Sequence, residues 1–310
     1  MVFKRLLNGL LSLLNGAGQV MFQQSPLAGA LFLAGIFWGA FECGTPQVAL
    51  GAVLGLAAST LAGALAFRRG GAGDGGRGLW GFNGILVGCA LPTFLADTAG
   101  MWVALIIGAM LTPLVRASLD RLLKPLGIGS LTFPFVLLTW VLLLCLGASG
   151  AVPPAEAAAS AAPTCVRLSA ATLAEGWLKG ISQVFLINSS VTGALFLAGL
   201  AVSDFKAALW CAAGSAIAVA TAALFNGDPG AIADGLYGFN PALTGIAIGL
   251  VFTIGRRTAW PAIAAILATL LVQAAVGALA AQAGLPTLTA PFCLTTWIFI
   301  IIARRLTRGG

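Results

Sequence analysis

An internal duplication constrains the fold of this chain more than any other feature. The heptapeptide GALFLAG occupies residues 29–35 and returns at residues 193–199, an offset of 164. LTFPF at 131–135 matches LTAPF at 288–292, and the GFN tripeptides match as well, both at an offset of 157. Matching markers in the same order indicate that the two halves share one fold. The change of offset predicts a seven-residue deletion in the second half, which we assign to the Gly-rich stretch at 70–76.

Long apolar runs place both halves in a membrane. The chain of 310 residues is 59% hydrophobic and 8% charged, whereas soluble domains carry about 25% charged residues. Runs of about 20 apolar residues are long enough to cross a bilayer. In the first half we predict a short segment at about 6–24 and spans at about 27–43, 47–67, 80–96, 101–119 and 133–148. In the second half we predict a short segment at about 170–188 and spans at about 191–203, 207–225, 236–254, 259–281 and 290–303.

The predicted fold class is therefore an all-α polytopic membrane protein made of two inverted repeats. Each repeat has five transmembrane helices plus a short half-inserted pore helix. Because five is an odd number, the second repeat enters the membrane in the opposite orientation, and the pore is expected at the repeat interface. We assign residues 1–150 to the first repeat, 151–169 to a linker and 170–310 to the second repeat, all within one integral membrane domain.

The basic residues indicate orientation in the membrane rather than nucleic-acid binding. The chain has a net charge of +7 and a pI near 9.5, but its basic residues lie in short clusters between apolar spans, as in cytoplasmic loops. With the N-terminus in the cytoplasm, residues such as Lys4, Arg116 and Arg304 fall inside, and only Arg167 and Lys179 fall outside. We therefore predict a multi-pass membrane protein with cytoplasmic N- and C-termini and no nucleic-acid partner.

Several residue types and motifs that catalysis, metal binding and ATP binding need are absent from the sequence. The chain has no His, and its six Cys are scattered without a CxxC pair, so neither a metal site nor a disulfide framework is indicated. No Walker-type phosphate loop is present. The predicted spans hold almost no ionisable side chain, with Glu42 as the exception, whereas ion-coupled carriers keep buried charges. These features predict passive movement of a neutral solute, without enzyme activity or a cofactor.

The stretch LPTLTAPF at residues 285–292 interrupts an apolar segment and predicts a pore wall. Pro286 and Pro291 leave helical carbonyl groups unpaired. Broken backbone at membrane depth is tolerated where protein buries it or where it lines a wet cavity. The first half repeats the pattern, with Thr132 at the place of Thr289. Two hydroxyl groups beside equivalent breaks are therefore candidate solute contacts.

Side-chain amides also recur in both halves. Gln19 and Gln183 precede apolar residues, and a Gln presents both a donor and an acceptor to a solute. Hydrogen bonds that only hold the helix bundle together are the alternative for every such pair. For Asn83 and Asn240, in the GFN copies, that alternative is the interpretation we favour. Phe22 fits a pore wall and lipid-facing packing equally well.

The chain resembles the urea transporter family, and in particular its bacterial members. The resemblance rests on the Gln19-Val20 and Gln183-Val184 segments, on the GFN copies and on the motif around each predicted break. It therefore covers essentially the whole chain. The first half has Ile128-Gly129 in place of Leu-Pro but keeps Thr132, Pro134 and Phe135. The second half matches the motif L-P-x-x-T-x-P-F fully, with Leu285, Pro286, Thr289, Pro291 and Phe292.

This resemblance implies passive, channel-like urea transport by a homotrimer in a bacterial inner membrane, with one narrow pore per subunit. A ladder of oxygen acceptors binds the urea amides, and apolar and aromatic walls sandwich its flat faces. Carried over by position, Gln19 and Gln183 cap the outer parts of the selectivity filter, and Thr132 and Thr289 form its central constriction. The apolar walls are assigned to Val20, Phe22, Leu86, Val184, Leu186 and Leu243.

Two other transporter classes are the alternatives to a urea channel. Asn240-Pro241-Ala242 is the NPA tripeptide of aquaporin-like water and glycerol channels, but the first half has Asn83-Gly84-Ile85 at the equivalent place. An ion-coupled carrier of a small amide is the other alternative, and the shortage of charge within the spans argues against it.

Overall fold

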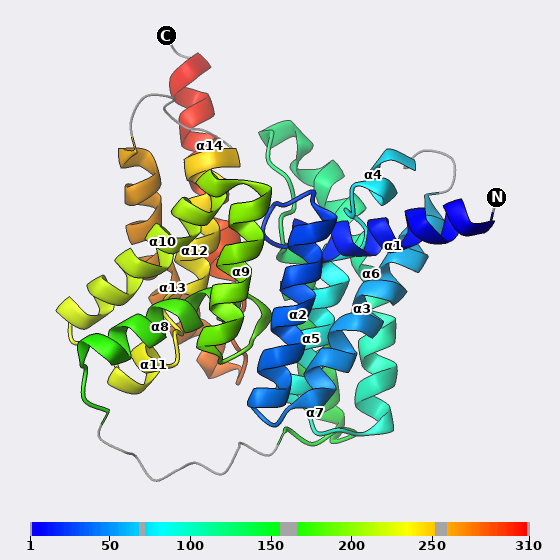
Figure 1. Cartoon of the computed structure of the whole chain (residues 1–310), viewed down its shortest axis with the longest axis horizontal. Helices are drawn as coiled ribbons and strands as arrows, with labels where there is room; N and C mark the ends of the chain where they lie inside the picture. The colour runs from blue at the N-terminus through cyan, green and yellow to red at the C-terminus, as the bar shows by residue number, and fades with distance from the viewer. Residues whose placement is uncertain (1, 68–71, 156–165, 252–258, 309–310) are drawn as a thin grey trace.

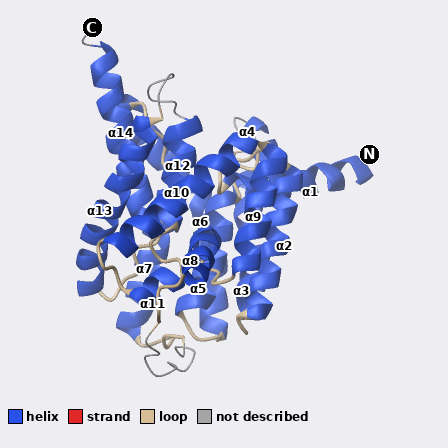
Figure 2. Cartoon of the chain, turned by 60° about the vertical axis from the view of Figure 1, so that its left-hand side comes forward, coloured by secondary structure: helices blue, strands red, loops and turns tan. Residues whose placement is uncertain are grey.

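The computed structural model describes residues 2–67, 72–155, 166–251 and 259–308, and these residues form a bundle of helices (Figures 1 and 2). Their one β feature is an isolated bridge between Leu95 and Pro154. The first half contains α1 (Val2–Gln19), α2 (Pro26–Glu42), α3 (Pro46–Ala66), α4 (Ala72–Gly76), α5 (Phe82–Phe94), α6 (Ala99–Leu123), η1 (Lys124–Leu126) and α7 (Phe133–Ser149). The second half contains α8 (Ala170–Ser182), η2 (Gln183–Phe185), α9 (Ser190–Ser203), α10 (Phe205–Leu224), α11 (Pro229–Ala233), α12 (Phe239–Ile246), the π-helical η3 (Ala247–Val251), α13 (Trp260–Gln282) and α14 (Ala290–Arg308).

Each predicted apolar segment coincides with helix to within about five residues at its ends. Polar caps set several of the starts. Ser25 accepts a hydrogen bond from the amide of Ala28 at the start of α2, and Asp204 accepts two from the first turn of α10. The predicted span at 236–254 is α12 followed by η3, and its residues 252–254 lie outside the described part of the chain. Residues 156–165 of the predicted linker lie outside it as well.

Helix length and hydropathy identify a multi-pass membrane protein. Within the described residues, α3, α6 with η1, α10 and α13 are each long and apolar enough to cross a membrane. α8 with η2 and α9 add a fifth candidate, which bends by 73° at a short break. α2, α5, α7 and α12 with η3 are apolar but shorter.

The two halves meet where α2 and α9 pack side by side (Figure 1). The contact is reciprocal, because Gly35 of α2 lies against the ring of Phe196 and Gly199 of α9 lies against the ring of Phe32. The two rings meet edge to face with their centroids 5.2 Å apart. Small residues let helices in a membrane approach closely. The duplicated GALFLAG segments therefore form the seam between the halves.

The difference in length between the halves does not lie where the sequence analysis placed it. α4 has its counterpart in α11 at the offset of 157, so a deletion at 70–76 is wrong. α2 has 17 residues and α9 has 14. Three residues join α2 to α3, whereas Asp204 alone joins α9 to α10. Most of the missing residues are therefore absent from the end of α9 and from its connection to α10. Asp204 alone forms that connection and also caps α10.

Gly193 offers a direct test of the close packing between α8 and α9. A Cβ atom at Gly193 would meet the carbonyl group of Leu178, and such overpacking costs about 1–3 kcal/mol. We therefore expect Gly193→Ala to lower the midpoint of thermal unfolding in detergent, measured by fluorescence-detected size-exclusion chromatography. Gly147→Ala is the matched control, because Gly147 in α7 has open space around it. Equal midpoints for the two variants would contradict this account of the packing.

Candidate solute pathway

Two breaks in the helical backbone lie where the halves meet at the centre of the molecule. Residues 127–132 precede α7 and residues 283–289 precede α14, and neither stretch is helical. Leu131 and Leu288, at equivalent places, have positive φ angles of 53° and 48°. Pro134 lies in the first turn of α7, where a missing N–H leaves no helical bond unmade. The predicted interruption of helix at both motif copies is confirmed, and the two helices begin there rather than passing through.

A buried Asn holds each break in shape. Nδ2 of Asn83 donates to the carbonyl of Leu131 at 3.4 Å, and its Oδ1 accepts from the amide of Phe135 at 3.1 Å. Asn240 makes the corresponding two bonds to the break before α14, at 3.1 and 3.2 Å. One side-chain amide has both a donor and an acceptor, so it satisfies two backbone groups that the break leaves without helical partners. Both Asn residues therefore brace the breaks themselves.

One tryptophan ties each break to the opposite half. Trp140 of α7 donates from Nε1 to the carbonyl of Pro286 at 2.7 Å, and Trp297 of α14 donates to the carbonyl of Gly129 at 2.8 Å. Neither tryptophan is among the predicted site residues. The signal that was available is their spacing, because Trp140 and Trp297 stand at the same offset of 157 as the motif itself.

The hydroxyl groups of Thr132 and Thr289 meet between the two breaks. Their Oγ1 atoms are 2.7 Å apart, and either can be the donor. Both residues are buried, so each hydroxyl spares the other the cost of an unpaired polar group. The Sγ atom of Cys293 lies 3.4 Å from Oγ1 of Thr132. At the position equivalent to Cys293 the first half has Val136.

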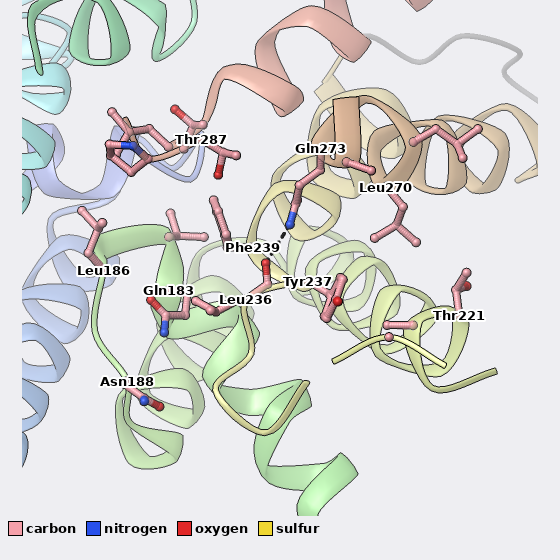
Figure 3. A pocket seen from close by; sticks show the side chains of 18 of the residues that line it. Gln183, Leu186, Asn188, Thr221, Leu236, Tyr237, Phe239, Leu270, Gln273 and Thr287 are labelled. Atoms are coloured by element: carbon pink, nitrogen blue, oxygen red, sulfur yellow. Dashed lines mark hydrogen bonds between the residues drawn. The ribbon is translucent and has the colours of Figure 1, made fainter. Parts of the chain in front are cut away.

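A cavity lies on each side of the threonine pair. The smaller, of about 220 Å³, reaches Thr132, and the larger, of about 1160 Å³, reaches Thr289 and continues along α10 and α13. Figure 3 shows part of the larger one. Each cavity is completed by a phenylalanine of the opposite half. The small cavity is lined by Gln19, Val20, Phe22, Phe82 and Thr132 together with Phe292. The equivalent lining of the large cavity is Gln183, Val184, Leu186, Phe239 and Thr289 together with Phe135.

Gln19 and Gln183 sit in equivalent turns at the two cavities. Nε2 of Gln19 donates to the carbonyl of Arg77, and Nε2 of Gln183 donates to the carbonyl of Asp234, both at 2.9 Å. These bonds fix each amide by its nitrogen, which leaves its Oε1 atom to accept hydrogen bonds in the cavity.

The kink that follows each glutamine is also shared by the two halves. Phe22 and Leu186 stand at equivalent positions and have φ angles of 63° and 59°. Phe22 meets Phe292 edge to face, with the ring centroids 6.1 Å apart. The large cavity has Leu186 at the place of that first ring, so the backbone is conserved between the halves while one aromatic wall is not.

Comparison with known proteins shows which family the chain belongs to. Residues 10–304 match the family model described as urea transporter. The chain belongs to the urea transporter family. Among its relatives, Urea transporter 1 of Ovis aries is 28% identical over 304 residues, which cover 94% of this chain and 76% of that protein. Urea transporter 1 of Rattus norvegicus is 30% identical over 303 residues, with the same shares covered.

Membership of the urea transporter family makes this chain a membrane transporter and not an enzyme. The resemblance that rested on the duplicated motif is confirmed over nearly the whole chain. Within the described residues, no group of three or more His, Cys, Asp or Glu side chains comes together in a way that could hold a metal ion.

Two of the expected wall residues are not among the residues that line the two cavities of this urea transporter family member. Leu86 and Leu243 are fully buried, and neither belongs to the described lining of a cavity. Phe82 and Phe239, one turn earlier on α5 and α12, line the cavities. Neither phenylalanine is among the predicted wall residues, although both stand in the duplicated GFN motif.

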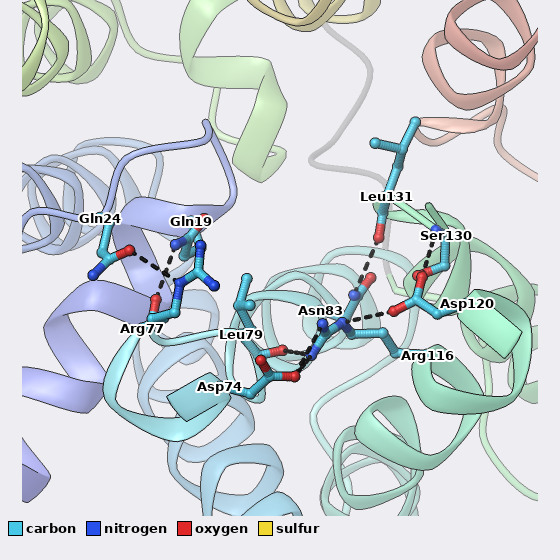
Figure 4. Close-up of polar contacts among 10 residues, drawn as sticks. All are labelled: Gln19, Gln24, Asp74, Arg77, Leu79, Asn83, Arg116, Asp120, Ser130 and Leu131. Carbon is cyan, nitrogen blue, oxygen red and sulfur yellow. Dashed lines mark hydrogen bonds and ion pairs between the residues drawn. The ribbon is translucent and has the colours of Figure 1, made fainter. Parts of the chain in front are cut away.

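The rim of the small cavity carries an ion-pair network (Figure 4). Arg116 pairs with Asp74 at 3.3 Å and with Asp120 at 3.2 Å, and it donates to the carbonyl of Leu79 at 3.0 Å. Asp120 accepts from the amide of Ser130 at 2.7 Å, at the break before α7. The network therefore supports this break from the side, and its opposite charges are paired within it.

The second half performs the same task with a neutral side chain. Gln273 stands at the position equivalent to Arg116. It donates to the carbonyl of Leu236 at 2.7 Å (Figure 3). It also accepts a hydrogen bond from Asn240 at 3.1 Å. The described lining of the large cavity contains no charged side chain. The two cavities thus have equivalent backbone positions, but only the small cavity has charged side chains in its described lining.

The role of the Asn residues in bracing the breaks can be tested by stability. Asn240→Ala removes both partners of the backbone groups at 288 and 292, and each unpaired buried group costs about 1–3 kcal/mol. We expect a lower midpoint of thermal unfolding in detergent. Asn8→Ala is the matched control, because Asn8 lies on the exposed part of α1. An Asn240→Ala protein that melts with the wild type would show that the break holds its shape without the side chain.

Proposed function

We propose that this protein conducts urea passively, as a channel-like transporter whose path joins the two cavities through the Thr132–Thr289 constriction. The observation that carries the proposal is the threonine pair, whose hydroxyls lie 2.7 Å apart between two cavities with equivalent linings. Relatives that bear the name Urea transporter 1 support urea as the substrate.

The chemistry of urea suits this arrangement. Urea is flat and neutral, with four N–H donors and one strong acceptor, and losing water without replacement costs about 2–7 kcal/mol for each polar group. Oε1 of Gln19 and Oε1 of Gln183 offer acceptors in the cavities, and the two threonine hydroxyls offer both a donor and an acceptor between them. Stepwise exchange along such a path keeps each binding step weak enough for release.

Apolar walls provide the selectivity in this proposal. Phe22 and Phe292, whose rings meet edge to face with centroids 6.1 Å apart, form the proposed aromatic wall on one side of the constriction. We place Leu86 and Leu243 beside the constriction itself, since both are fully buried one turn beyond the cavity-lining phenylalanines of their helices. An ion that lost its water there would find no compensating charge. The remaining proposed wall residues are Val20, Val184 and Leu186.

The path is proposed to run between two inverted repeats, residues 1–150 and 170–310, each with five transmembrane helices and one half-inserted helix, joined by residues 151–169. Three pairs of exchanged contacts support a two-fold axis near the threonine pair: the glycine–phenylalanine seam, the tryptophan bonds to opposite breaks, and the phenylalanine that each cavity takes from the other half. The bend of 73° between α8 and α9 supports a half-inserted segment.

Orientation and assembly follow the same reasoning. Figure 1 draws α1, α4 and the end of α14 toward the same side of the molecule, which supports cytoplasmic placement of both termini together with the basic residues near them. A bacterial inner membrane and a homotrimer with one path per subunit are expected from the family resemblance.

Stopped-flow efflux from proteoliposomes without an ion gradient tests the proposal. We expect fast urea efflux, slow glycerol efflux and no response to a proton or sodium gradient. Water or glycerol flux without urea flux would favour an aquaporin-like channel, against which Asn240 already argues because its amide is bonded to the break. Urea flux that appears only with an imposed gradient would favour an ion-coupled carrier.

The constriction predicts that Thr289→Val slows urea efflux about tenfold or more. Val keeps the shape of Thr but removes one of the two hydroxyls that would replace the water of urea at the constriction, and a buried polar group left without a partner costs about 1–3 kcal/mol. Thr289→Ser should restore flux. Thr139→Val is the matched control, because Thr139 is buried in α7 and its hydroxyl has no described partner. Wild-type flux through a well-folded Thr289→Val protein would remove the threonine pair from the mechanism.

The glutamine acceptors predict a change in selectivity. Gln19→Leu removes the amide oxygen from the small cavity, so we expect the ratio of urea flux to glycerol flux to fall severalfold while the yield of folded protein changes little. Gln47→Leu, at the start of α3 and outside both cavity linings, is the matched control. If Gln19→Leu lowers the yield and leaves the flux ratio intact, the role of Gln19 is structural.

A further inference from the structure

We propose that the N-terminal half of α1, residues 2–11, is a membrane-surface anchor that lays its leucines into the cytoplasmic leaflet and prefers anionic lipid. This inference rests on the chain being a membrane protein and is independent of what the pathway conducts.

The sequence of α1 separates into an apolar and a polar face. At 100° per residue, Leu6, Leu7, Leu10 and Leu11 fall on one side of the helix, and Asn8 falls on the other. All four leucines are exposed in the structure, with Leu6 at 69% and Leu10 at 53%. The neighbouring helices α2 and α3 are apolar all round instead. A helix that is amphipathic, basic at one end and leucine-rich on one face is typical of the membrane interface.

The direction of α1 agrees with a position on the surface. In Figures 1 and 2, α1 runs across the ends of α2 and α3 and its N-terminal part projects beyond the bundle. Its polar face is turned toward α4 and the loop that follows. Ser12 donates to the carbonyl of Gly75, and Asn15 donates to the carbonyl of Gly76 at 2.9 Å. With α4 on the aqueous side, the opposite face of the helix is directed toward the bilayer.

The second half supplies an internal control for the leucines. α8 is the counterpart of α1 and begins at Ala170, which is equivalent to Leu6. The exposed positions of α8 that match Leu7, Leu10 and Leu11 hold Ala171, Ala174 and Glu175. The repeated scaffold therefore does not need large apolar side chains at these places.

The helical extension at residues 2–5 likewise has no helical counterpart in α8, and it contains two basic residues, Lys4 and Arg5. The side chain of Lys4 is exposed. The exposed leucines and this helical extension are therefore found in α1 and not in α8. The end of the molecule that carries α1 is the one proposed to face the cytoplasm, where the leaflet carries anionic lipid that attracts basic residues next to a membrane.

The proposed anchor is connected to the solute pathway, because α1 is one continuous helix from the anchored residues to Gln19. The same helix ends at Gln19, which lines the small cavity and is held there by the carbonyl of Arg77. The lipid contact of residues 2–11 thus fixes one end of a helix whose other end positions a lining residue.

Hydrogen–deuterium exchange of the full chain in nanodiscs tests the proposal. Exchange of the amides at residues 6–12 reports how often the helix leaves the surface and opens. Leu6→Ala with Leu10→Ala copies the residues of α8, and we expect these amides to exchange at least about tenfold faster because the buried leucine surface is lost. Asn8→Ala should leave exchange unchanged. Identical exchange in the leucine variant and the wild type would overturn the proposal.

Charge provides a separate test of the lipid preference. Lys4→Gln should speed exchange about fivefold in nanodiscs that contain phosphatidylglycerol, which corresponds to ~1 kcal/mol for one charge near an anionic surface. It should have no effect in pure phosphatidylcholine. Protection that follows the number of protein copies per disc, and not the lipid, would mean that a second copy covers this face, and the lipid anchor would be rejected.

A photoreactive side chain identifies the partner directly. Leu10→p-benzoylphenylalanine should form lipid adducts on illumination, detected by mass spectrometry, whereas Asn8→p-benzoylphenylalanine on the polar face should not. Adducts with protein at position 10, or equal lipid labelling at both positions, would contradict the proposed orientation.

Discussion

The structure depends on how it satisfies the backbone at two breaks in an apolar interior. A break in a membrane helix leaves N–H and C=O groups that find no water in the bilayer core. Here Asn83 and Asn240 each bond one carbonyl and one amide of a break, and the tryptophan of the opposite half takes a further carbonyl. The threonines are therefore held by parts that do not line the cavities themselves, and each half is completed only by the other.

Duplication fixed the backbone of both halves, and the differences between them show what each end of the path requires. Arg116 and Gln273 donate to equivalent carbonyls, but one belongs to an ion-pair network and the other to a neutral one. Phe22 and Leu186 keep the same left-handed turn with different walls. These differences leave the hydrogen bonds of the breaks intact, so side chains at the two mouths have diverged while the geometry around the threonines has not.

The sequence predicts those parts of this fold that depend on periodicity and repetition. Helix positions follow from apolar runs, and the two breaks follow from Pro286 and Pro291 in the second half and from Pro134 in the first. The place of the length difference did not follow, because a cap such as Asp204 can replace a loop without leaving a gap in hydropathy. Phe82 and Phe239 were missed for a related reason: which side of a buried helix faces a cavity is decided by its neighbours, and a helix that is apolar all round carries no record of it.

The threonine pair links closure to selectivity in the proposed mechanism. The two hydroxyls satisfy each other across the path at 2.7 Å. A urea molecule that enters between them brings both donors and an acceptor, so the bond that breaks is exchanged for bonds to the solute, and the net change in free energy is small. An apolar solute leaves two buried hydroxyls unpaired, and a cation loses its water against leucine and phenylalanine walls. The same bond therefore closes the path to solutes that cannot replace it.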